Sequence, residues 1–320
     1  MPARPNVFVT RKIPESGLLL LKKETDVTLN PNDRALKRNE FLEYIKGRDG
    51  ILTQLNDKMD AQVMEAAGKQ LKVISNYAVG FDNIDVKEAT KRGIVVTNTP
   101  GVLTEGTADF AWALLMSAAR RVVEADALVR QGKFVGWDPL LLLGGNIYGK
   151  TLGIIGFGRI GQAVARRAYG FNMKILAYHP SRVIEAPGIA AKFVSLSELL
   201  KESDFITLHT PLTPETRHLI GEKELKSMKP TAYLINTARG PVIDEAALAK
   251  ALKEKWIAGA GLDVYEKEPE VHPELLKLPN VVLAPHISSA SFETRSDISL
   301  LAAKNLLAVL RGEPSLHRVN

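Results

Sequence analysis

Three ionisable side chains in the second half of the chain stand where an apolar segment has just ended. Arg239 follows one such segment, Glu268 comes five residues after Asp263, and His286 follows another. An arginine can hold a carboxylate by two parallel hydrogen bonds, and a histidine can exchange a proton near neutral pH. A carboxylate beside that histidine fixes its tautomer and raises its pKa. Each residue alone is more often structural, but together they suit hydride transfer to a 2-oxo acid.

The glycines of a G-x-G-x-x-G motif lie between a predicted strand, Leu152–Ile155, and a predicted helix that starts at Arg159. This strand-to-helix context makes the motif specific. Gly156 would permit a tight turn, Gly158 would let backbone amides approach a pyrophosphate, and Gly161 would let the helix pack closely on the sheet. The helix N-terminus would offer free N–H groups and a positive dipole end to the phosphates. The motif therefore predicts a dinucleotide site.

The residues at the end of the strand that follows this helix help to determine which dinucleotide binds. Enzymes that prefer NAD commonly place Asp or Glu there, where it accepts hydrogen bonds from the ribose hydroxyls. The segment Tyr178–Arg182 contains no carboxylate. A ribose phosphate would instead find Arg182, the hydroxyl of Ser181 and the ring of His179. We therefore expect NADP(H) to be preferred, with NAD as the alternative.

Short strands and helices alternate along the chain, which predicts parallel sheets covered by helices on both faces. Strands are expected over 6–10, 26–29, 50–55, 71–76, 94–96, 152–155, 174–178, 204–209, 232–236, 258–264 and 281–284. Helices are expected over 14–23, 38–46, 60–67, 86–92, 107–130, 159–169, 195–201, 222–227, 245–254 and 292–311. The pattern predicts an α/β protein with two doubly wound units, of which the second carries the glycine loop.

The helix expected over 107–130 is longer than usual. We place Asp109 in its first turn, where a carboxylate is favoured. The following segment, 132–149, holds Phe134, Trp137 and the run Leu140–Leu143, and it is too apolar for an exposed loop. Two interpretations are open: the segment covers the active site, or it lies in a subunit interface.

The segment Asn76–Asp82 follows another predicted strand and has two interpretations. Gly80 could expose backbone N–H groups to an anion, since ligands on parallel sheets bind beyond the carboxyl ends of strands. Alternatively, Asn76 and Asp82 are ordinary turn residues. The residue pattern alone favours the ordinary turn.

Composition narrows the class of protein. The 320 residues are 45% apolar and 24% charged, as in a globular protein of two domains. No apolar run is long enough to span a bilayer, and no signal peptide is evident, so no membrane association is expected. Cysteine is absent, which excludes disulfides and thiolate metal sites and suits the cytoplasm; no metal is expected. The net charge of +6 is spread along the chain, so nucleic acid is not an expected partner.

Several motifs together resemble a known family. In chain order they are NYAVGFDNID, VTNTPGVLTEGTAD, GFGRIG, LINTARGPVID, GAGLDVYEKEP and APHI. The chain is similar over nearly its whole length to the D-isomer-specific 2-hydroxyacid dehydrogenases, and within them it looks most like the glyoxylate/hydroxypyruvate reductases. The resemblance implies a flavodoxin-like substrate (catalytic) domain, residues 1–100 plus 288–320, and a Rossmann dinucleotide-binding domain, residues 101–287. It also implies a homodimer whose contact is the helix and arm at 107–149.

The resemblance also assigns roles. Arg239 would anchor the substrate carboxylate and polarise the carbonyl, His286 would donate the proton, Glu268 would pair with it, and Asp263 would contact the carboxamide side of the nicotinamide. The implied substrate-binding residues are Leu55, Ala78, Val79, Gly80, Arg239 and His286, which reverses the preference for an ordinary turn at 76–82. The implied cofactor-binding residues are Thr104, Gly156, Phe157, Gly158, Arg159, Ile160, Gly161, His179, Ser181, Arg182, Thr210, Pro211, Thr216, Thr237, Ala238, Asp263 and Ser288.

The predicted function is reduction of glyoxylate or hydroxypyruvate to glycolate or D-glycerate by NADPH. One alternative is a reductase for another small 2-oxo acid, including a bulkier or phosphorylated one. A second is a nucleotide-sensing binding protein, because the same family contains transcriptional corepressors. The chain shows no appended peptide-recruiting tail, which argues against the second alternative.

Overall fold

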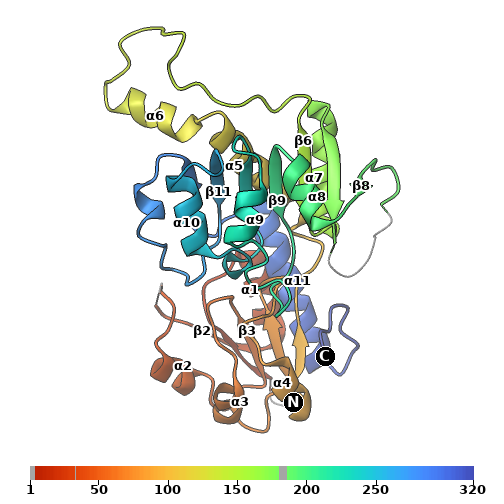
Figure 1. The fold of residues 1–320 in the computed structure, drawn as a ribbon. Helices are drawn as coiled ribbons and strands as arrows, with labels where there is room; N and C mark the ends of the chain where they lie inside the picture. The colour runs from red at the N-terminus through yellow and green to blue at the C-terminus, as the bar shows by residue number, and fades with distance from the viewer. Residues whose placement is uncertain (1–3, 33, 180–185) are drawn as a thin grey trace. The chain divides into compact units, whose positions relative to one another are not determined.

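The computed structural model describes residues 4–32, 34–179 and 186–320 (Figure 1). The chain divides into two compact units. Unit 1 consists of Met1–Leu103 and Ala290–Asn320, and unit 2 of Thr104–Ser289. Each contains its own parallel sheet, so the predicted α/β fold with two parallel sheets is confirmed.

The described part of unit 1 is built on five parallel strands in the order β2-β1-β3-β4-β5. The strands are β1 (Asn6–Val9), β2 (Asp26–Leu29), β3 (Gly50–Thr53), β4 (Val73–Asn76) and β5 (Val95–Thr97). The helices are α1 (Glu15–Glu24), α2 (Arg38–Tyr44), α3 (Ala61–Ala67), α4 (Val86–Lys91) and α11 (Phe292–Leu310). Successive residues of β1 alternate between the two faces: Val7 and Val9 pack with α1 and α11, and Phe8 packs with α2 and α3. Burial on both faces explains why these strands are continuous apolar runs.

The described part of unit 2 is built on seven parallel strands in the order β12-β11-β10-β9-β6-β7-β8. The strands are β6 (Thr151–Ile155), β7 (Lys174–Tyr178), β8 (Lys192–Phe193), β9 (Phe205–Leu208), β10 (Tyr233–Asn236), β11 (Gly259–Leu262) and β12 (Val281–Leu283). The helices are α5 (Thr104–Ala119), α6 (Val122–Arg130), α7 (Arg159–Ala168), α8 (Leu196–Glu202), α9 (Glu222–Ser227) and α10 (Glu245–Lys253), with 3-10 turns at Tyr169–Phe171, Gly240–Val242 and Leu275–Lys277. Helices α5 and α7 cover one face of the sheet, and α8, α9 and α10 cover the other.

The prediction of one long helix over 107–130 is wrong. Helix α5 begins at Thr104 and ends at Ala119, and a new helix, α6, starts after Arg121, whose φ of 54° lies in the left-handed region. The break has a physical cause, because Gly145 donates its backbone N–H to the carbonyl of Ala119 (2.9 Å) and so takes a partner from the end of the helix. Asp109 is therefore outside the first turn, and it pairs instead with Arg167 of α7 (2.7 Å).

Smaller differences concern the ends of elements. Several strands are one or two residues shorter than expected, and β8 was not expected at all. Strand β3 ends at Thr53 because the backbone N–H of Gln54 donates to the side chain of Asp57 (2.8 Å) and not to a neighbouring strand.

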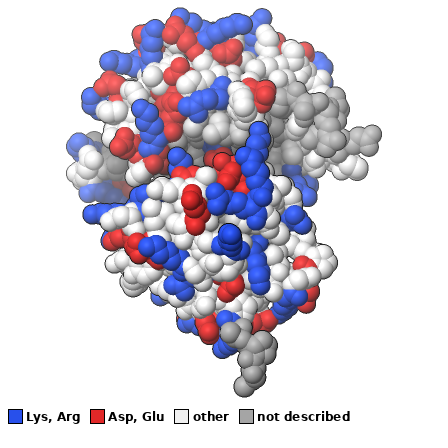
Figure 2. All heavy atoms as spheres, turned by 90° about the horizontal axis from the view of Figure 1, so that it is seen from below, with Lys and Arg blue, Asp and Glu red and all other residues white. Residues whose placement is uncertain are grey.

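The apolar segment after α6 is exposed within one chain, although the sequence predicts that it is covered. Val135 is 98% exposed and Trp137 86%, and Phe134, Leu140 and Leu143 are also exposed. Charged side chains of both signs are mixed on the face shown in Figure 2, in keeping with a net charge spread along the chain. Across the described residues, no helix has both the length and the apolar character needed to cross a membrane.

Candidate active site

The polar residues singled out in the sequence lie at one edge of the sheet of unit 2. Arg239 follows β10, Glu268 lies in the connection after β11, and His286 follows β12. Because all these strands are parallel, their carboxyl ends share an edge, which is where α/β sheets bind ligands. The three catalytic candidates therefore belong to one unit and to neighbouring strands.

The turn that carries Arg239 is fixed by its backbone. Asn236 donates from Nδ2 to the carbonyl of Arg239 (2.9 Å), and Nη1 of Arg239 donates to the preceding carbonyl (2.8 Å). The next residue, Gly240, lies so close to the backbone of Tyr265 that an added Cβ would be 1.9 Å from the Tyr265 carbonyl. Only glycine allows this approach, which brings the turn of Arg239 against the segment that continues to Glu268.

His286 and Glu268 form a hydrogen-bonded pair. Nδ1 of His286 is 2.8 Å from Oε2 of Glu268, and each side chain is 27% exposed. An ionised carboxylate only accepts, so Nδ1 must be the donor, and Nε2 is the ring nitrogen that remains for a ligand. The second carboxylate oxygen accepts from the backbone N–H of Tyr265 (3.1 Å), which fixes the orientation of the pair.

Opposing effects act on the Glu268 carboxyl. Burial raises its pKa, but the hydrogen bond and charge of His286, the amide of Tyr265 and the charge of Arg239 together hold the pKa below its ordinary value. Glu268 is therefore ionised near neutral pH. A charged carboxylate beside an imidazole stabilises the protonated ring, which is the form that can donate a proton.

Asp263 holds the turn that carries His286. Its carboxylate is fully buried, and its two oxygens accept the backbone N–H groups of Ile287 and Ser288 (2.7 Å each). Its carbonyl accepts the N–H of His286 (2.9 Å), whose φ of 54° lies in the left-handed region. Burial raises the pKa of Asp263, while the two amides and the charge of His286 oppose that rise. The expected contact with a nicotinamide would use lone pairs that these amides leave open.

The glycine loop has the geometry expected of a phosphate-binding turn. Gly156 has a φ of 93°, and an added Cβ would lie 2.6 Å from the carbonyl of His209. An added Cβ on Gly161 would lie 2.2 Å from the carbonyl of Gly156, so the helix packs tightly on the loop. Gly158 is different: nothing lies within 4 Å of its Cβ position, and it caps α7 without a side-chain hydrogen bond. The N-terminus of α7 is thus open to an anion.

Buried polar atoms without partners gather at the same edge. Among the described residues, the hydroxyls of Thr210 and Thr237 and Nδ1 of His209 are buried and make no hydrogen bond. Burial lowers the pKa of His209 to about 3, so its imidazole is neutral. Buried polar groups are normally paired, and unpaired ones need an explanation. These atoms and the open N-terminus of α7 fit a dinucleotide with hydroxyl, amide and phosphate groups.

In unit 1, the segment expected to bind the substrate follows β4. Asn76 donates to the carbonyl of Gly80 (2.7 Å), Asn98 donates to that of Val79 (2.8 Å), and the N–H of Thr99 donates to that of Ala78 (3.0 Å). No hydrogen bond from the amides of Val79 or Gly80 is present within the described part of the chain. The turn is thus held through its carbonyls, which leaves two amides for an anion.

The comparisons with known proteins agree with this site. Residues 112–288 match the family model of the D-isomer specific 2-hydroxyacid dehydrogenase, NAD binding domain. The chain is 57% identical over 322 aligned residues to a glyoxylate reductase of Thermococcus litoralis, an alignment that covers 99% of this chain and 97% of that one. The chain belongs to the D-isomer-specific 2-hydroxyacid dehydrogenases. It is therefore an NAD(P)-dependent oxidoreductase.

Solved structures support the same assignment. A glyoxylate reductase from Paecilomyes thermophila matches this dehydrogenase with a TM-score of 0.88 and 36% identity, covering 100% of this chain and 99% of that one. An NADPH-dependent glyoxylate/hydroxypyruvate reductase from Sinorhizobium meliloti, solved with NADP and malonate, matches with a TM-score of 0.84 and 35% identity, covering 99% and 97%.

The remaining cofactor residues expected from the sequence differ in what they offer. The ring of Phe157 is fully buried in the core, so only its backbone could reach a ligand. The hydroxyl of Thr216 already donates to the carbonyl of Pro211 (2.7 Å). Ser181 and Arg182 lie outside the described residues. Thr104, Ile160, His179 and Ala238 are half-buried, Arg159 is exposed and Ser288 is buried.

Sequence reasoning missed a second set of contacts beside the pair of His286 and Glu268. His218 bonds to Glu266 (2.7 Å), two residues before Glu268. The buried carboxylate of Glu245 accepts the N–H groups of Glu266 (2.7 Å) and His272 (2.8 Å). These bonds hold the segment that carries Glu268 from both ends. The only feature of the sequence that points to these contacts is the pair of glutamates in YEKEP, and it does not show which residues bind them.

Proposed function

We propose that this dehydrogenase reduces glyoxylate and hydroxypyruvate to glycolate and D-glycerate, with NADPH as hydride donor and His286 as proton donor. The observation that carries the proposal is the 2.8 Å bond between Glu268 and Nδ1 of His286, which reserves Nε2 for proton delivery. The names of the relatives support the substrate. The Thermococcus litoralis protein is a glyoxylate reductase, and the Sinorhizobium meliloti protein is a glyoxylate/hydroxypyruvate reductase.

Each catalytic residue has a separate role in this proposal. Arg239 holds the substrate carboxylate through parallel hydrogen bonds, and its positive charge polarises the carbonyl. The reduced nicotinamide, when bound, supplies the hydride for the carbonyl carbon. His286 gives the proton on Nε2 to the carbonyl oxygen, and Glu268 stabilises the imidazolium before the transfer. The product is a 2-hydroxy acid, of D configuration where it is chiral.

Unit 1 takes the role of substrate domain in the proposal. The free amides of Val79 and Gly80 bind the substrate carboxylate, while Leu55 and Ala78 contact the rest of the molecule. Both segments directly follow central strands, β3 and β4, which supports this role.

Unit 2 takes the role of dinucleotide domain. The open N-terminus of α7 binds the pyrophosphate, and the unpartnered hydroxyls of Thr210 and Thr237 bind further polar groups of the cofactor. The other proposed cofactor residues are Thr104, Gly156, Phe157, Gly158, Arg159, Ile160, Gly161, His179, Ser181, Arg182, Pro211, Thr216, Ala238, Asp263 and Ser288. Preference for NADPH rests on the absence of a carboxylate in 178–182 and on the name of the Sinorhizobium meliloti relative.

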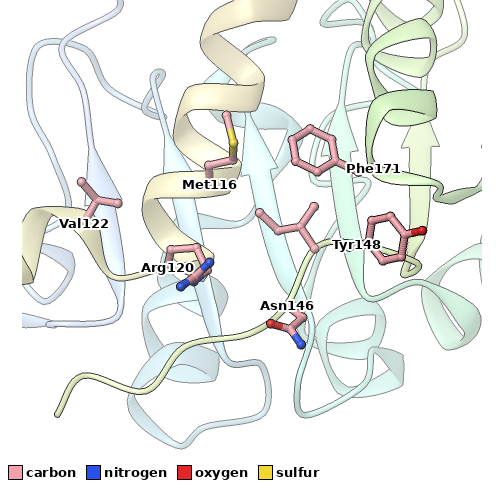
Figure 3. Close-up of a pocket in the computed structure, with 7 residues that line it drawn as sticks. Met116, Arg120, Val122, Asn146, Tyr148 and Phe171 are labelled. Carbon is pink, nitrogen blue, oxygen red and sulfur yellow. The ribbon is translucent and has the colours of Figure 1, made fainter. Parts of the chain in front are cut away.

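The proposed oligomer is a homodimer formed through the segment after α6. Large apolar side chains there are exposed to an extent that a lone chain rarely shows. Beside it, at the C-terminal end of α5, lies a largely apolar hollow of about 400 Å³ (Figure 3). Its lining includes Met116, Tyr148 and Phe171, so a second copy can bury apolar surface on both the segment and the hollow.

The test is the loss of reduced-cofactor absorbance with glyoxylate, hydroxypyruvate, pyruvate and phenylpyruvate, each with NADPH and with NADH. Faster turnover of the two small acids with NADPH supports the whole proposal. If a bulkier acid is reduced faster, the proposed substrate is wrong but the proposed reaction stands. Tight NADPH binding with no turnover of any acid would contradict the proposal and favour a nucleotide-sensing protein.

A further inference from the structure

Another hollow lies wholly within unit 1, and the proposed function does not use it. It has a volume of about 320 Å³ and is lined by Arg11, Lys12, Ile13, Pro14, Gln54, Tyr77 and Arg295. Three of the seven lining residues are cationic and none is acidic. A concave site of this size with several converging donors can hold a small polar ligand.

The hollow lies at the ligand-binding edge of the sheet. Its residues follow β1, β3 and β4, which are neighbours in the sheet, and Arg295 comes from the first turn of α11. Leu55 directly follows Gln54, and Ala78 directly follows Tyr77. Two residues that line the hollow are therefore sequence neighbours of residues proposed to bind the substrate. The cationic side chains of the hollow add positive charge beside those residues.

The arginine of α11 directs its charge toward this space. The hydroxyl of Tyr77 donates to the backbone carbonyl of Arg295 (2.6 Å), and the positive charge of Arg295 acts on the same hydroxyl. None of the described carboxylates forms an ion pair with Arg295 or Lys12. Both cations therefore leave charge available to a ligand, at a site where Tyr77 is itself buried.

Gln54 supplies an unsatisfied donor. Its backbone N–H donates to Asp57 (2.8 Å) and its carbonyl accepts from Asn83 (3.0 Å), so its backbone is fixed on both sides. Its side-chain nitrogen, Nε2, is buried and has no hydrogen-bond partner among the described residues. A buried amide without a partner in a cationic hollow is explained by an oxygen ligand.

The carboxylate of Asp57 lies near the hollow and is held by its own donors. The positive charge of Arg11 acts on the carboxylate of Asp57, which also accepts the hydroxyls of Thr10 and Thr53 and the amide of Gln54. All three of these donors bind the same oxygen of Asp57, Oδ2. Lys12 and Arg295 remain as positive charges in the lining, and the positive N-terminal end of α1 begins directly after Pro14.

We propose that this hollow is a second anion-binding site, which takes a carboxylate or phosphate group. The group is either the distal acidic group of a 2-oxo acid or a free anion. The first case rests on the proposed function and would make Arg295 a specificity-determining residue. The second case is independent of that function.

A paired-substrate assay tests the first case. Oxaloacetate and 2-oxobutyrate have the same number of carbons, but only oxaloacetate carries a second carboxylate. The ratio of their kcat/KM values should fall about tenfold in Arg295→Gln, because one charge-assisted hydrogen bond is lost. Arg295→Lys should recover part of the ratio. Lys46→Gln removes an exposed cation of unit 1 that pairs with Glu43, and it should leave the ratio unchanged.

Calorimetric titration with inorganic phosphate, in the presence of saturating NADPH, tests the second case. Binding that is weakened about tenfold by Arg295→Gln, but not by Arg239→Gln or Lys46→Gln, supports a free-anion site. Phosphate binding lost only in Arg239→Gln would assign phosphate to the catalytic site. An unchanged kinetic ratio together with unchanged phosphate binding in Arg295→Gln overturns the proposal. Failure of glyoxylate turnover would refute the proposed function, while the phosphate titration would still decide on the hollow.

Discussion

Replacing Glu268 with glutamine should move the pH dependence of glyoxylate reduction to lower pH. On the proposed function the proton donor is the imidazolium form of His286, so turnover should fall as the pH rises. Glu268, whose pKa lies below its ordinary value, is ionised over the working range and stabilises that imidazolium. The amide of glutamine can still accept the Nδ1 hydrogen, but it carries no charge. The variant therefore lacks the negative charge that stabilises the proton-donating form.

The size of the shift follows from the geometry of the pair. The two side chains are 27% exposed and 2.8 Å apart, so they are only partly screened by water. A hydrogen bond to a charged group is worth about 1.5–3 kcal/mol, against about 1 kcal/mol for a neutral one. The difference of roughly 0.5–2 kcal/mol corresponds to a shift of the descending limb by about half a unit to one and a half pH units. Glutamine also has one acceptor oxygen where glutamate has two, so the N–H of Tyr265 loses its acceptor.

The assay is kcat/KM for glyoxylate measured from about pH 5 to about pH 10, where the descending limb reports the acid. The matched control is Glu266→Gln, which makes the same chemical change two residues away but affects the partner of His218. The limb should move in Glu268→Gln and stay in Glu266→Gln. A Glu268→Gln limb that coincides with that of the wild type refutes the role assigned to the pair, and so does an equal shift in both variants.

Three further outcomes are expected. Arg182→Ala should raise the KM for NADPH more than the KM for NADH; equal losses would mean that this arginine does not bind the ribose phosphate. Gly158→Ala should weaken dinucleotide binding while changing the free energy of unfolding by less than about 1 kcal/mol. Gly240→Ala should lower the free energy of unfolding by more than about 1 kcal/mol, because the added methyl group clashes with Tyr265. Equal shifts of the melting temperature in the two variants would contradict this. Trp137→Ser should shift the light-scattering mass toward that of a monomer while Leu276→Ser, another exposed apolar position, should not; no shift for Trp137→Ser would argue against the proposed dimer contact.

The place of the catalytic candidates in the fold was predictable because apolar runs in the sequence mark where strands end. Buried parallel strands are apolar runs, so the first polar residues after a run stand at the carboxyl edge of the sheet. Arg239 and His286 were found in that way, and the structure places both at this edge beside Glu268. The alternation of strands and helices along the chain predicted the two parallel sheets, because a helix between two strands allows them to run parallel.

The break between α5 and α6 was not predictable from local sequence. Residues 107–130 contain no glycine or proline, so nothing nearby stops a helix. The cause lies further along the chain, where Gly144 and Gly145 cross the end of α5 and Gly145 bonds to the carbonyl of Ala119. A contact between segments separated in the sequence leaves no periodic signal.

The bonds around Glu266 were missed for a related reason. His218, Glu245 and His272 come from three separate segments, and each has an ordinary surface-type side chain. Sequence spacing shows which residues lie on one strand or helix, but not which loops meet. The close approach of Gly240 to Tyr265 is of the same kind, because it is visible only once both turns are folded.

On the proposed function, the residues that transfer the proton and the residues that select the substrate belong to different units. The hydrogen bonds that orient Glu268 and His286 come from Tyr265 and Asp263, all within unit 2. Asp263 holds the turn of His286 by three backbone contacts, so the pair is preorganised before any ligand binds. On the proposed function, the groups that distinguish one 2-oxo acid from another belong to unit 1. Substitutions there can change which acid is reduced while the proton donor and its partner keep their geometry.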